Sequence, residues 1–554
     1  MSIASEVSPD LLWKHLESIC QWERYTGTPG ETQTVEYISH ELSALGIDVE
    51  IHEFDALISI PGKASLDILG ETEEHIPAIT AVFGASTGEG SVTGDAVYVG
   101  EAVAPEGPVA GRIVVAERML SPGRFFEFEQ AGAIGQVYVN MGYAHEMTVS
   151  TVWGSPTPES VGRLPATPVV TLSREQGQGL IDLLKTKHEV KLRIHAKTDT
   201  AWRKTTMPVA AISPPSGGDE YVLVGGHLDS WHFGANDNGA GDTTLMELAR
   251  LIHNHRGEIR RGLRVAWWNG HSHGRFSGST WYADHMFEEL RANCAAYLNI
   301  DQPGCRQCTI YRPFCTADIS AWVKDAVSRL GGQETVPDDP QKMADQSFWG
   351  VGVPSFSFLP ILPPDAPDLQ KDHPESGFPE YWHNPADTID KMDKDLLAEH
   401  TRLYASALFE LCTAERFPLD LRPMADVVDK TLADLTGRAG NVFDFDPVVS
   451  AANRFRKSAE SLAAKADAIG PGAMNQATRK ISHALNAALY TQLGPFDHDR
   501  ASGAQVLPGL QRVADYLAAG PENHNGRVLY TRLVRERNRA CAALNAASDI
   551  ASSV

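Results

Sequence analysis

The sequence predicts an α/β fold whose mixed sheet is covered by helices on both faces, with an inserted β-rich domain and a C-terminal helical domain. Three observations carry this prediction. Short apolar runs alternate with segments of helical spacing over residues 207–417. Residues 57–200 are instead rich in Gly, Val and short strand-like runs. After residue 418 the chain has a high Ala content and helical periodicity.

These segments divide the chain into three predicted units. Residues 11–54 show a helix, a turn, a second helix and an alternating strand. They join the later α/β segment as a discontinuous catalytic domain, made of residues 1–56 and 201–417. The insertion spans residues 57–200 and contains the runs GDAVYVG, GRIVVAER, GQVYVNMG and PATPVVTLS. Residues 418–554 form the helical domain.

Composition excludes several classes of partner. The chain has 554 residues, of which 42% are hydrophobic and 21% charged, as in ordinary globular proteins. Its net charge of -23 argues against a nucleic acid or an anionic membrane surface as a partner. No apolar run approaches the ~20 residues of a membrane helix. The first residues show neither a basic nor an apolar signal region, so we expect a cytoplasmic protein.

Cysteine spacing offers only a weak signal. Seven cysteines in a chain of this length do not indicate a disulfide framework. Cys305, Cys308 and Cys315 lie close together in the sequence, but no fourth ligand is evident nearby and a lone C-x-x-C is weak evidence for a metal site. We therefore interpret these cysteines as free thiols that are buried or half-buried.

The most informative segment is GGHLDSWHFGANDNGAG, residues 225–241. The preceding run YVLVGG is typical of a buried strand, so His227 lies at a strand end, and Asp237 lies in a loop that opens a helix. Imidazole and carboxylate groups are the ligands that zinc-like ions prefer. Taken alone, a capping Asp and a surface His would also explain the segment.

Two further acid or imidazole positions follow in matching contexts. AAYLNIDQPG ends an apolar run at Asp301, and EYWHNPADTIDKMD carries His383 in a loop before a helix. The series HLDSW, GANDNGAG, NID and YWHNPADTIDKMD resembles the dizinc metallopeptidase family of aminopeptidases, glutamate carboxypeptidase and the transferrin receptor. The motifs occur in the same order as in that family, and the resemblance covers most of the chain.

The resemblance implies a zinc exopeptidase-like fold and a ligand set. One ion, Zn²⁺ or another divalent transition metal, would be held by His227, Asp237 and Asp301. A second ion would be held by Asp237, His383 and one further ligand, giving one or two ions per chain. Asp229 would orient His227 without touching the metal.

The sequence departs from this family at its paired glutamates, a general base followed by a metal ligand. The matching segment here, RVAWWNGHSHGRFSGSTWYA, holds no acid. Alignment from Trp268 places His271 on the base and Ser272 on the ligand position. Alignment from Gly278 and Ser279 places Ser272 on the base and His273 on the ligand position.

Imidazole serves both as a metal ligand and as a general base near pH 7. We therefore interpret His273 as a ligand and His271 as the base or a substrate contact. The alternative is a non-catalytic dimeric scaffold, as in the transferrin receptor branch. A third possibility is a transferase-type relative such as glutaminyl cyclase, which the additional domains disfavour.

Four other residues are candidate substrate contacts. Arg275 in the altered loop is suited to an anionic substrate group, or pairs with a surface acid. Gln346 lies in a segment that lines the cleft in relatives, although a structural amide is an equal alternative. Trp231 and His232 follow the HLDS motif, and either residue is placed to line the pocket.

These residues lead to a predicted activity. The protein is expected to hydrolyse an amide or peptide bond, in a small-molecule amide or a short peptide, with a metal-activated water. The insertion resembles the protease-associated domain of relatives, and the last unit resembles their dimerisation domain. A homodimer is therefore implied, with neither a nucleic acid nor a membrane as partner.

Overall fold

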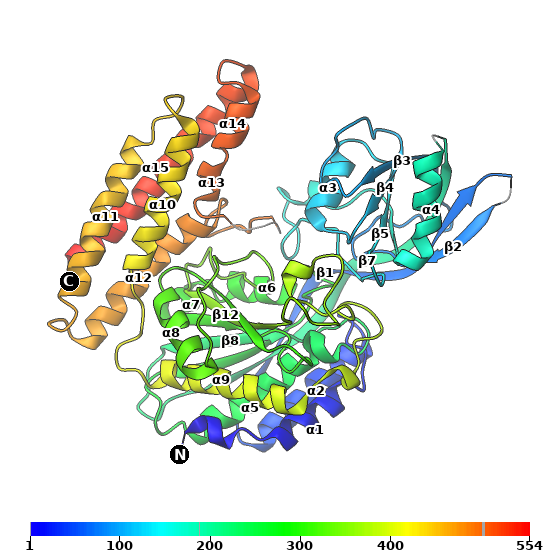
Figure 1. The fold of residues 1–554 in the computed structure, drawn as a ribbon. Coiled ribbons are helices and arrows are strands. Elements are labelled where there is room, and N and C mark those ends of the chain that lie inside the picture. Colours follow the sequence, from blue (N-terminus) through cyan, green and yellow to red (C-terminus); the bar gives the residue numbers. More distant parts are fainter. Residues whose placement is uncertain (1, 72, 188, 501–504) are drawn as a thin grey trace.

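The computed structural model describes residues 2–500, apart from residues 72 and 188, and residues 505–554. A mixed sheet lies at the centre of the catalytic unit, where β8 and β12 run between α6 and α7 on one side and α5 and α9 on the other (Figure 1). Its strand order is β11-β12-β10-β8-β9-β7. The four strands β8, β9, β10 and β12 are parallel, whereas β11 and β7 flank them in the antiparallel direction. The bounds are β7 Lys191–Ile212, β8 Tyr221–His227, β9 Gly262–Trp268, β10 Cys294–Asn299, β11 Ile310–Cys315 and β12 Ser355–Ile361.

Alternating side chains of these strands form two separate cores. Val222 and Val224 of β8 pack into the larger core with α1, α5, α8 and α9, whereas Tyr221 and Leu223 face α6 and α7. Since successive residues of a strand point to opposite faces, an unbroken apolar run such as YVLV fits a sheet buried on both sides. The helices are α1 Pro9–Ile19, α2 Pro29–Ala44, α5 Ala240–Asn254, α6 Ser277–His285, α7 Phe287–Asn293, α8 Ser320–Gly331 and α9 Lys394–Thr413.

The parallel strands carry their loops to one edge of the sheet. His227 ends β8, the altered loop 269–276 follows β9, and Asp301 follows β10. The segment with His383 comes after β12. Because the carboxyl ends of parallel strands meet at the same edge, residues far apart in the sequence converge there.

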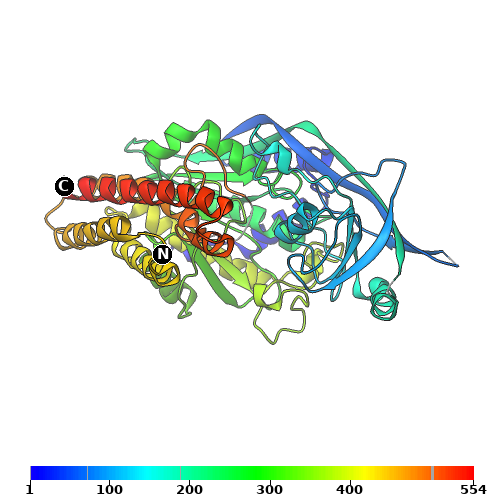
Figure 2. The same cartoon turned by 90° about the horizontal axis from the view of Figure 1, so that it is seen from above.

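A long two-stranded ladder connects the catalytic sheet to the insertion. β1 Asp48–Leu69 pairs with β7 along almost its whole length, and the pair arcs through both units (Figure 2). The expected boundaries at 56/57 and 200/201 face each other in this ladder, where Ile58 pairs with Ala201. They fall inside continuous strands, so the two units share backbone hydrogen bonds without a linker.

The insertion has its own parallel strands and helices. β3, β4, β5 and β6 pair in order, and β3 joins them to β7. Their apolar side chains form one core within the insertion and contribute to a second core that also takes in Trp231 of the catalytic domain. The elements are β2 Glu74–Ala78, β3 Val92–Gly100, β4 Ile113–Glu117, α3 Pro122–Gln130, β5 Gly135–Val139, β6 Val169–Leu172 and α4 Arg174–Thr186.

The C-terminal unit consists of helices that lie side by side at the end of the molecule opposite the insertion (Figures 1 and 2). They bury a third core, which also takes in Ala317 and Trp349 of the catalytic domain. The helices are α10 Arg422–Ala439, α11 Asp446–Ala464, α12 Pro471–Tyr490, α13 Pro508–Gln511, α14 Val513–Ala519 and α15 His524–Ser552. Among the described residues, no helix combines the length and apolar character needed to cross a membrane.

Candidate active site

Three side chains converge at the loop edge of the sheet with the chemistry of metal ligands. Ligand atoms of His227, Asp237 and Asp301 lie within 4.8 Å of one another, the only such group of His, Cys, Asp or Glu found in the described part of the chain. His227 Nε2 lies 2.9 Å from Asp237 Oδ1 and 3.7 Å from Asp301 Oδ1. Asp301 Oδ1 is buried without a hydrogen-bond partner, which suits an atom that binds a cation.

Backbone carbonyls orient the two imidazoles of this centre. His227 Nδ1 donates to the backbone oxygen of Asp229 at 2.8 Å. His383 Nδ1 donates to the backbone oxygen of Glu146 in the insertion at 2.7 Å, and its Nε2 lies 3.0 Å from Asp237 Oδ2. With Nδ1 carrying the proton, Nε2 of each ring is left as the ligand atom. Asp237 thus stands between His227 and His383, as a bridging ligand would.

The charges of this group also fit a bound cation. Burial alone would lower the pKa of His227, but hydrogen bonds to Asp237 and Asp301 raise it well above its usual value. Burial opposes ionisation of Asp237, yet His227 and His383 hold the pKa of that carboxyl well below its usual range. The pocket therefore favours an ionised Asp237 beside a positive charge, and a divalent metal would replace the proton of His227 in that role.

A buried acid that sequence analysis missed shapes the Asp237 loop. Asp387 accepts the backbone N–H groups of Asn236 at 2.8 Å and Asp237 at 3.0 Å. Burial and the charge of Asp237 raise the pKa of Asp387 to about 7. The sequence signal for Asp387 is the NPADT segment, which places an acid four residues after the candidate ligand His383.

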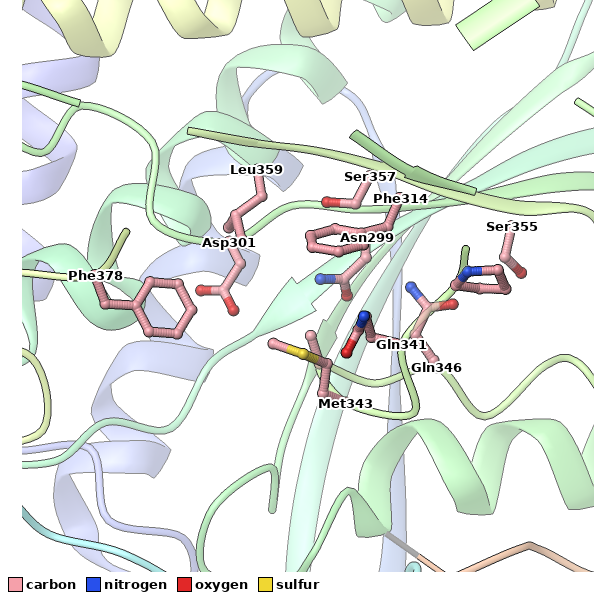
Figure 3. Close-up of a pocket in the computed structure, with 12 residues that line it drawn as sticks. Asn299, Asp301, Phe314, Gln341, Met343, Gln346, Ser355, Ser357, Leu359 and Phe378 are labelled. Carbon is pink, nitrogen blue, oxygen red and sulfur yellow. The ribbon is translucent and has the colours of Figure 1, made fainter. Parts of the chain in front are cut away.

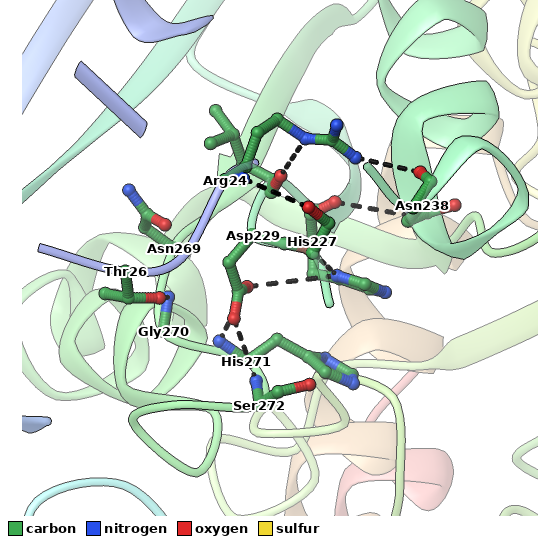
Figure 4. A network of polar contacts seen from close by, with 12 residues as sticks. Arg24, Thr26, His227, Asp229, Asn238, Asn269, Gly270, His271 and Ser272 are labelled. Atoms are coloured by element: carbon green, nitrogen blue, oxygen red, sulfur yellow. Dashed lines mark hydrogen bonds and ion pairs between the residues drawn. The ribbon is translucent and has the colours of Figure 1, made fainter. Parts of the chain in front are cut away.

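Asp229 holds the altered loop through its carboxylate (Figure 4). Its Oδ1 accepts the backbone N–H of His271 at 2.9 Å, and its Oδ2 accepts that of Ser272 at 3.0 Å. The nearest carboxylate atom lies 3.8 Å from His227 Nδ1. The backbone oxygen of Asp229 therefore orients His227, whereas the Asp229 side chain holds the loop 269–276 in place. The N-terminal segment adds a further support, because Thr26 Oγ1 accepts the N–H of Gly270 at 3.2 Å.

His271 and His273 of this loop point in different directions: His271 faces the cleft and His273 faces the protein interior. The His271 ring stacks on that of His227, with centroids 4.0 Å apart, and lines the cleft with Asp237, Asp301 and His383. His273 is fully buried, with its Nδ1 3.2 Å from Asp229 Oδ2 and its ring against Tyr25 and Trp231. His273 is not part of the metal-ligand group, so the arrangement favours His271 as the imidazole that serves the cleft.

His271 has a carboxylate partner that the sequence did not reveal. Its Nδ1 lies 2.7 Å from Asp345 Oδ2, and Asp345 Oδ1 accepts the hydroxyl of Ser279 at 2.8 Å. Asp345 is 1% exposed, so solvent does not compete for this bond. An imidazole held by a buried carboxylate at one nitrogen presents its other nitrogen for proton transfer. The sequence marks the neighbouring Gln346 as a candidate substrate contact, but no sequence pattern marks Asp345.

The cleft around these residues has a volume of about 320 Å³, within the range of small-molecule sites. Arg275 lines it together with His271. Gln346 lies deeper, in a small side cavity that shares Asp301 with the cleft (Figure 3). There its Oε1 accepts the indole N–H of Trp349. Trp231 is buried behind the site, with its ring 4.7 Å from that of His273.

The clustered cysteines play no part in this centre. All seven cysteines are free, and Cys305 and Cys308 lie in a small apolar cluster, where Cys305 Sγ is 3.0 Å from the hydroxyl of Tyr381. Cys315 belongs to the main core of the catalytic domain.

Comparison with known proteins agrees with this geometry. Residues 209–408 match Peptidase family M28. The probable lipoprotein aminopeptidase LpqL of Mycobacterium tuberculosis is 25% identical over 54% of this chain and 60% of that protein. Aminopeptidase YwaD of Bacillus subtilis is 24% identical over 72% of this chain and 83% of that protein. The chain thus spans less than two thirds of the length of LpqL.

Solved structures give the same fold. BSAP, a zinc aminopeptidase from Bacillus subtilis, superposes with a TM-score of 0.56 and 19% identity, over 74% of this chain and 98% of that one. The prediction of an α/β exopeptidase-like fold is therefore confirmed. The expectation of a divalent metal is supported by His227, Asp237 and Asp301, a group whose ligand atoms could hold an ion.

Proposed function

We propose that this protein, whose residues 209–408 match Peptidase family M28, is a metal-dependent hydrolase of an amide or peptide bond. His227, Asp237 and Asp301 would hold one zinc ion, and Asp237 and His383 would contribute to a second. A divalent ion held there polarises the carbonyl of the substrate and acidifies water. The observation that carries the proposal is the pair of His271 and Asp345 beside this ligand group.

His271 takes the role of general base in this proposal. Asp345 fixes the proton on Nδ1, so Nε2 is free to accept a proton from water and to return it to the leaving amine. Asp229 keeps His271 at this position by accepting its backbone N–H. His273 contacts the same Asp229 carboxylate and packs against Tyr25, and it thereby stabilises the loop on the side away from the cleft.

The insertion is proposed to act as a protease-associated-like wall of the cleft. The backbone oxygen of Glu146 holds His383, and Met147 and Thr148 line the cleft beside it. The insertion would therefore shape substrate access and complete the orientation of one ligand, without supplying a reacting group.

The remaining alternative is a non-catalytic scaffold on the same fold, and one experiment separates the two. Zinc-loaded protein should release amine from a panel of dipeptides and aminoacyl p-nitroanilides, and Asp301→Ala should lose both metal and turnover. The matched control is Asp325→Ala, because Asp325 lies on the exposed side of α8, paired with Arg329. A zinc-loaded wild type that cleaves no member of the panel would favour the scaffold.

The helical unit is proposed to form a homodimer through its outer end. Val528 and Tyr530 of α15, Leu517 of α14 and the adjacent Val442 are all exposed apolar side chains. Tyr530 contacts Phe443 and Tyr516, which are the sequence neighbours of Val442 and Leu517. The native mass, measured by light scattering, should be about twice 60.2 kDa, and Tyr530→Glu should halve it. A monomeric wild type would refute this part.

A further inference from the structure

The cleft contains a positive charge that the protein itself does not neutralise. Arg275 is 6% exposed, and no carboxylate of the described residues lies within ion-pair distance of its guanidinium. Its Nε is buried without a hydrogen-bond partner. An unpaired buried charge is costly, so a protein retains one where a ligand supplies the missing partner.

The position of Arg275 is fixed by the loop that also carries His271. Its backbone oxygen accepts the N–H of Gly154 at 2.6 Å, which ties the loop to the insertion. Its guanidinium carbon lies 4.8 Å from the centre of the Phe276 ring, and the His271 ring meets the same ring edge-on at 4.7 Å. Arg275 and His271 are therefore separated by a single aromatic ring, and both line the cleft.

A second cation lines the same cleft. Lys342 is 9% exposed, its Nζ lies 4.0 Å from the centre of the Trp153 ring, and it donates to the backbone oxygen of Gln346. Trp153 in turn stacks on Phe276, with centroids 4.0 Å apart. The acids of the cleft, Asp237 and Asp301, are engaged with the histidines of the metal centre. Among the described residues, no carboxylate forms an ion pair with Arg275 or Lys342, and the acid whose charge acts on Lys342, Asp499, lines a different pocket.

We propose that Arg275, assisted by Lys342, binds a carboxylate of the substrate next to the bond that is hydrolysed. This inference rests on the proposed function, which identifies the hydrolysed bond as an amide or peptide bond. A guanidinium offers two parallel N–H donors that match a carboxylate. The preferred substrates would then be acidic amides, in which the carboxylate is either a side chain or a free terminal group.

Binding is measured first, because it does not depend on turnover. Glutarate and its neutral analogue glutaramide are titrated into the zinc-loaded protein by calorimetry at fixed ionic strength. Glutarate should bind at least tenfold more tightly than glutaramide, and Arg275→Met should reduce glutarate affinity roughly tenfold to a hundredfold. Any direct contact of glutarate with zinc persists in this variant, so the difference isolates Arg275.

Two variants complete the binding test. Arg291→Met is the matched control, because Arg291 also lies over a phenylalanine, Phe287, and forms no ion pair with an acid of the described ranges, but it lies away from the cleft. It should leave glutarate affinity within twofold of the wild type. Arg275→Lys keeps the charge and should retain most of the binding, which covers the case that Arg275→Met does not fold. Unchanged glutarate affinity in Arg275→Met, or no preference of the wild type for glutarate, would overturn the proposal.

Turnover then identifies the source of the carboxylate. Ala-Ala amide has no carboxylate, Ala-Ala has a terminal carboxylate, and Ala-Glu amide has a side-chain carboxylate. The wild type should prefer one of the two acidic substrates in kcat/KM, and Arg275→Met should abolish that preference. Glutarate binding that depends on Arg275 without any hydrolysis would contradict the proposed function alone. Equal hydrolysis of all three, by the wild type and the variant, would contradict the carboxylate site alone.

Discussion

At the scale of single residues, one carboxylate organises the departure of this chain from the paired acids of the family that it resembles. Asp229 accepts two backbone N–H groups of the 271–273 loop and lies against the His273 ring nitrogen. This arrangement turns His271 toward the ligand group and His273 away from it. The His271 imidazole therefore faces the cleft, whereas the His273 imidazole stabilises the loop.

The two histidines should consequently differ in variants. His271→Ala should keep bound zinc and lose turnover on the order of a hundred- to ten-thousand-fold, since a base acts without holding the ion. His273→Ala should lower the melting temperature, because it removes a buried ring from between Tyr25 and Trp231. Metal analysis, turnover and thermal unfolding are measured on both proteins. Loss of zinc from His273→Ala at full stability would instead establish His273 as a ligand.

Asp345 should act through His271. Asp345→Asn keeps the shape of the side chain but removes the charge that fixes the imidazole tautomer, so kcat should fall on the order of a hundredfold or more while KM changes little. The zinc content should stay at the wild-type value. Asp345→Glu should restore part of the activity, whereas equal losses in both variants, accompanied by a lower melting temperature, would indicate a purely structural role.

At the scale of elements, the parallel strands explain how much of the site was predictable. His227, Asp237, Asp301 and His383 were identified because each lies beside a strand end or a helix start and matches a motif of the metallopeptidase family that the sequence resembles. Parallel strands bring such positions together. Asp345 and Asp387 were missed because they act through tertiary contacts, with His271 and with the backbone of residues 236–237. No local pattern marks such a contact. The same limit applies to the 271–273 loop, whose one extra residue made two alignments equally good.

One glycine allows the close approach of the catalytic domain to helix α12. Gly352 has a φ of +95°, and a Cβ atom there would lie 2.4 Å from the Cα of His483. Gly352→Ala should therefore destabilise the protein by about 2–4 kcal/mol, through backbone strain and overlap together. The control is Gly437→Ala in α10, where nothing lies within 4 Å of the new methyl group and a small gain is expected. Chemical denaturation that finds equal stabilities for the two variants would contradict this account.

At the scale of the whole molecule, the site is assembled from units with separate cores. The catalytic sheet supplies the ligand group, the insertion supplies the carbonyl that orients His383, and the helical unit packs on Ala317 and Trp349 near the Asp345 segment. The shared β1–β7 ladder keeps the insertion in register with the sheet. Cleft geometry therefore depends on all three units being folded and docked.

Buried neutral histidines in two of these units should make the molecule sensitive to acid. Burial lowers the pKa of His15 in α1 and of His400 in α9 to about 4, and that of His483 in α12 to about 3. A folded pKa below the unfolded value of about 6.5 means that the unfolded chain binds more protons. The stability that these groups contribute is therefore complete above pH 6.5 and is lost progressively as the pH falls toward 4 and 3.

A single variant tests this acid dependence. Between pH 6.5 and 5, His483 alone should account for about 2 kcal/mol of lost unfolding free energy, because each pKa unit is worth about 1.4 kcal/mol. His483→Leu removes that titration, so its unfolding free energy should fall less steeply with acid than that of the wild type. His40→Leu, at an exposed position of α2, is the matched control. Urea denaturation at several pH values measures the slopes, and identical slopes for the two variants would show that His483 does not carry the acid sensitivity.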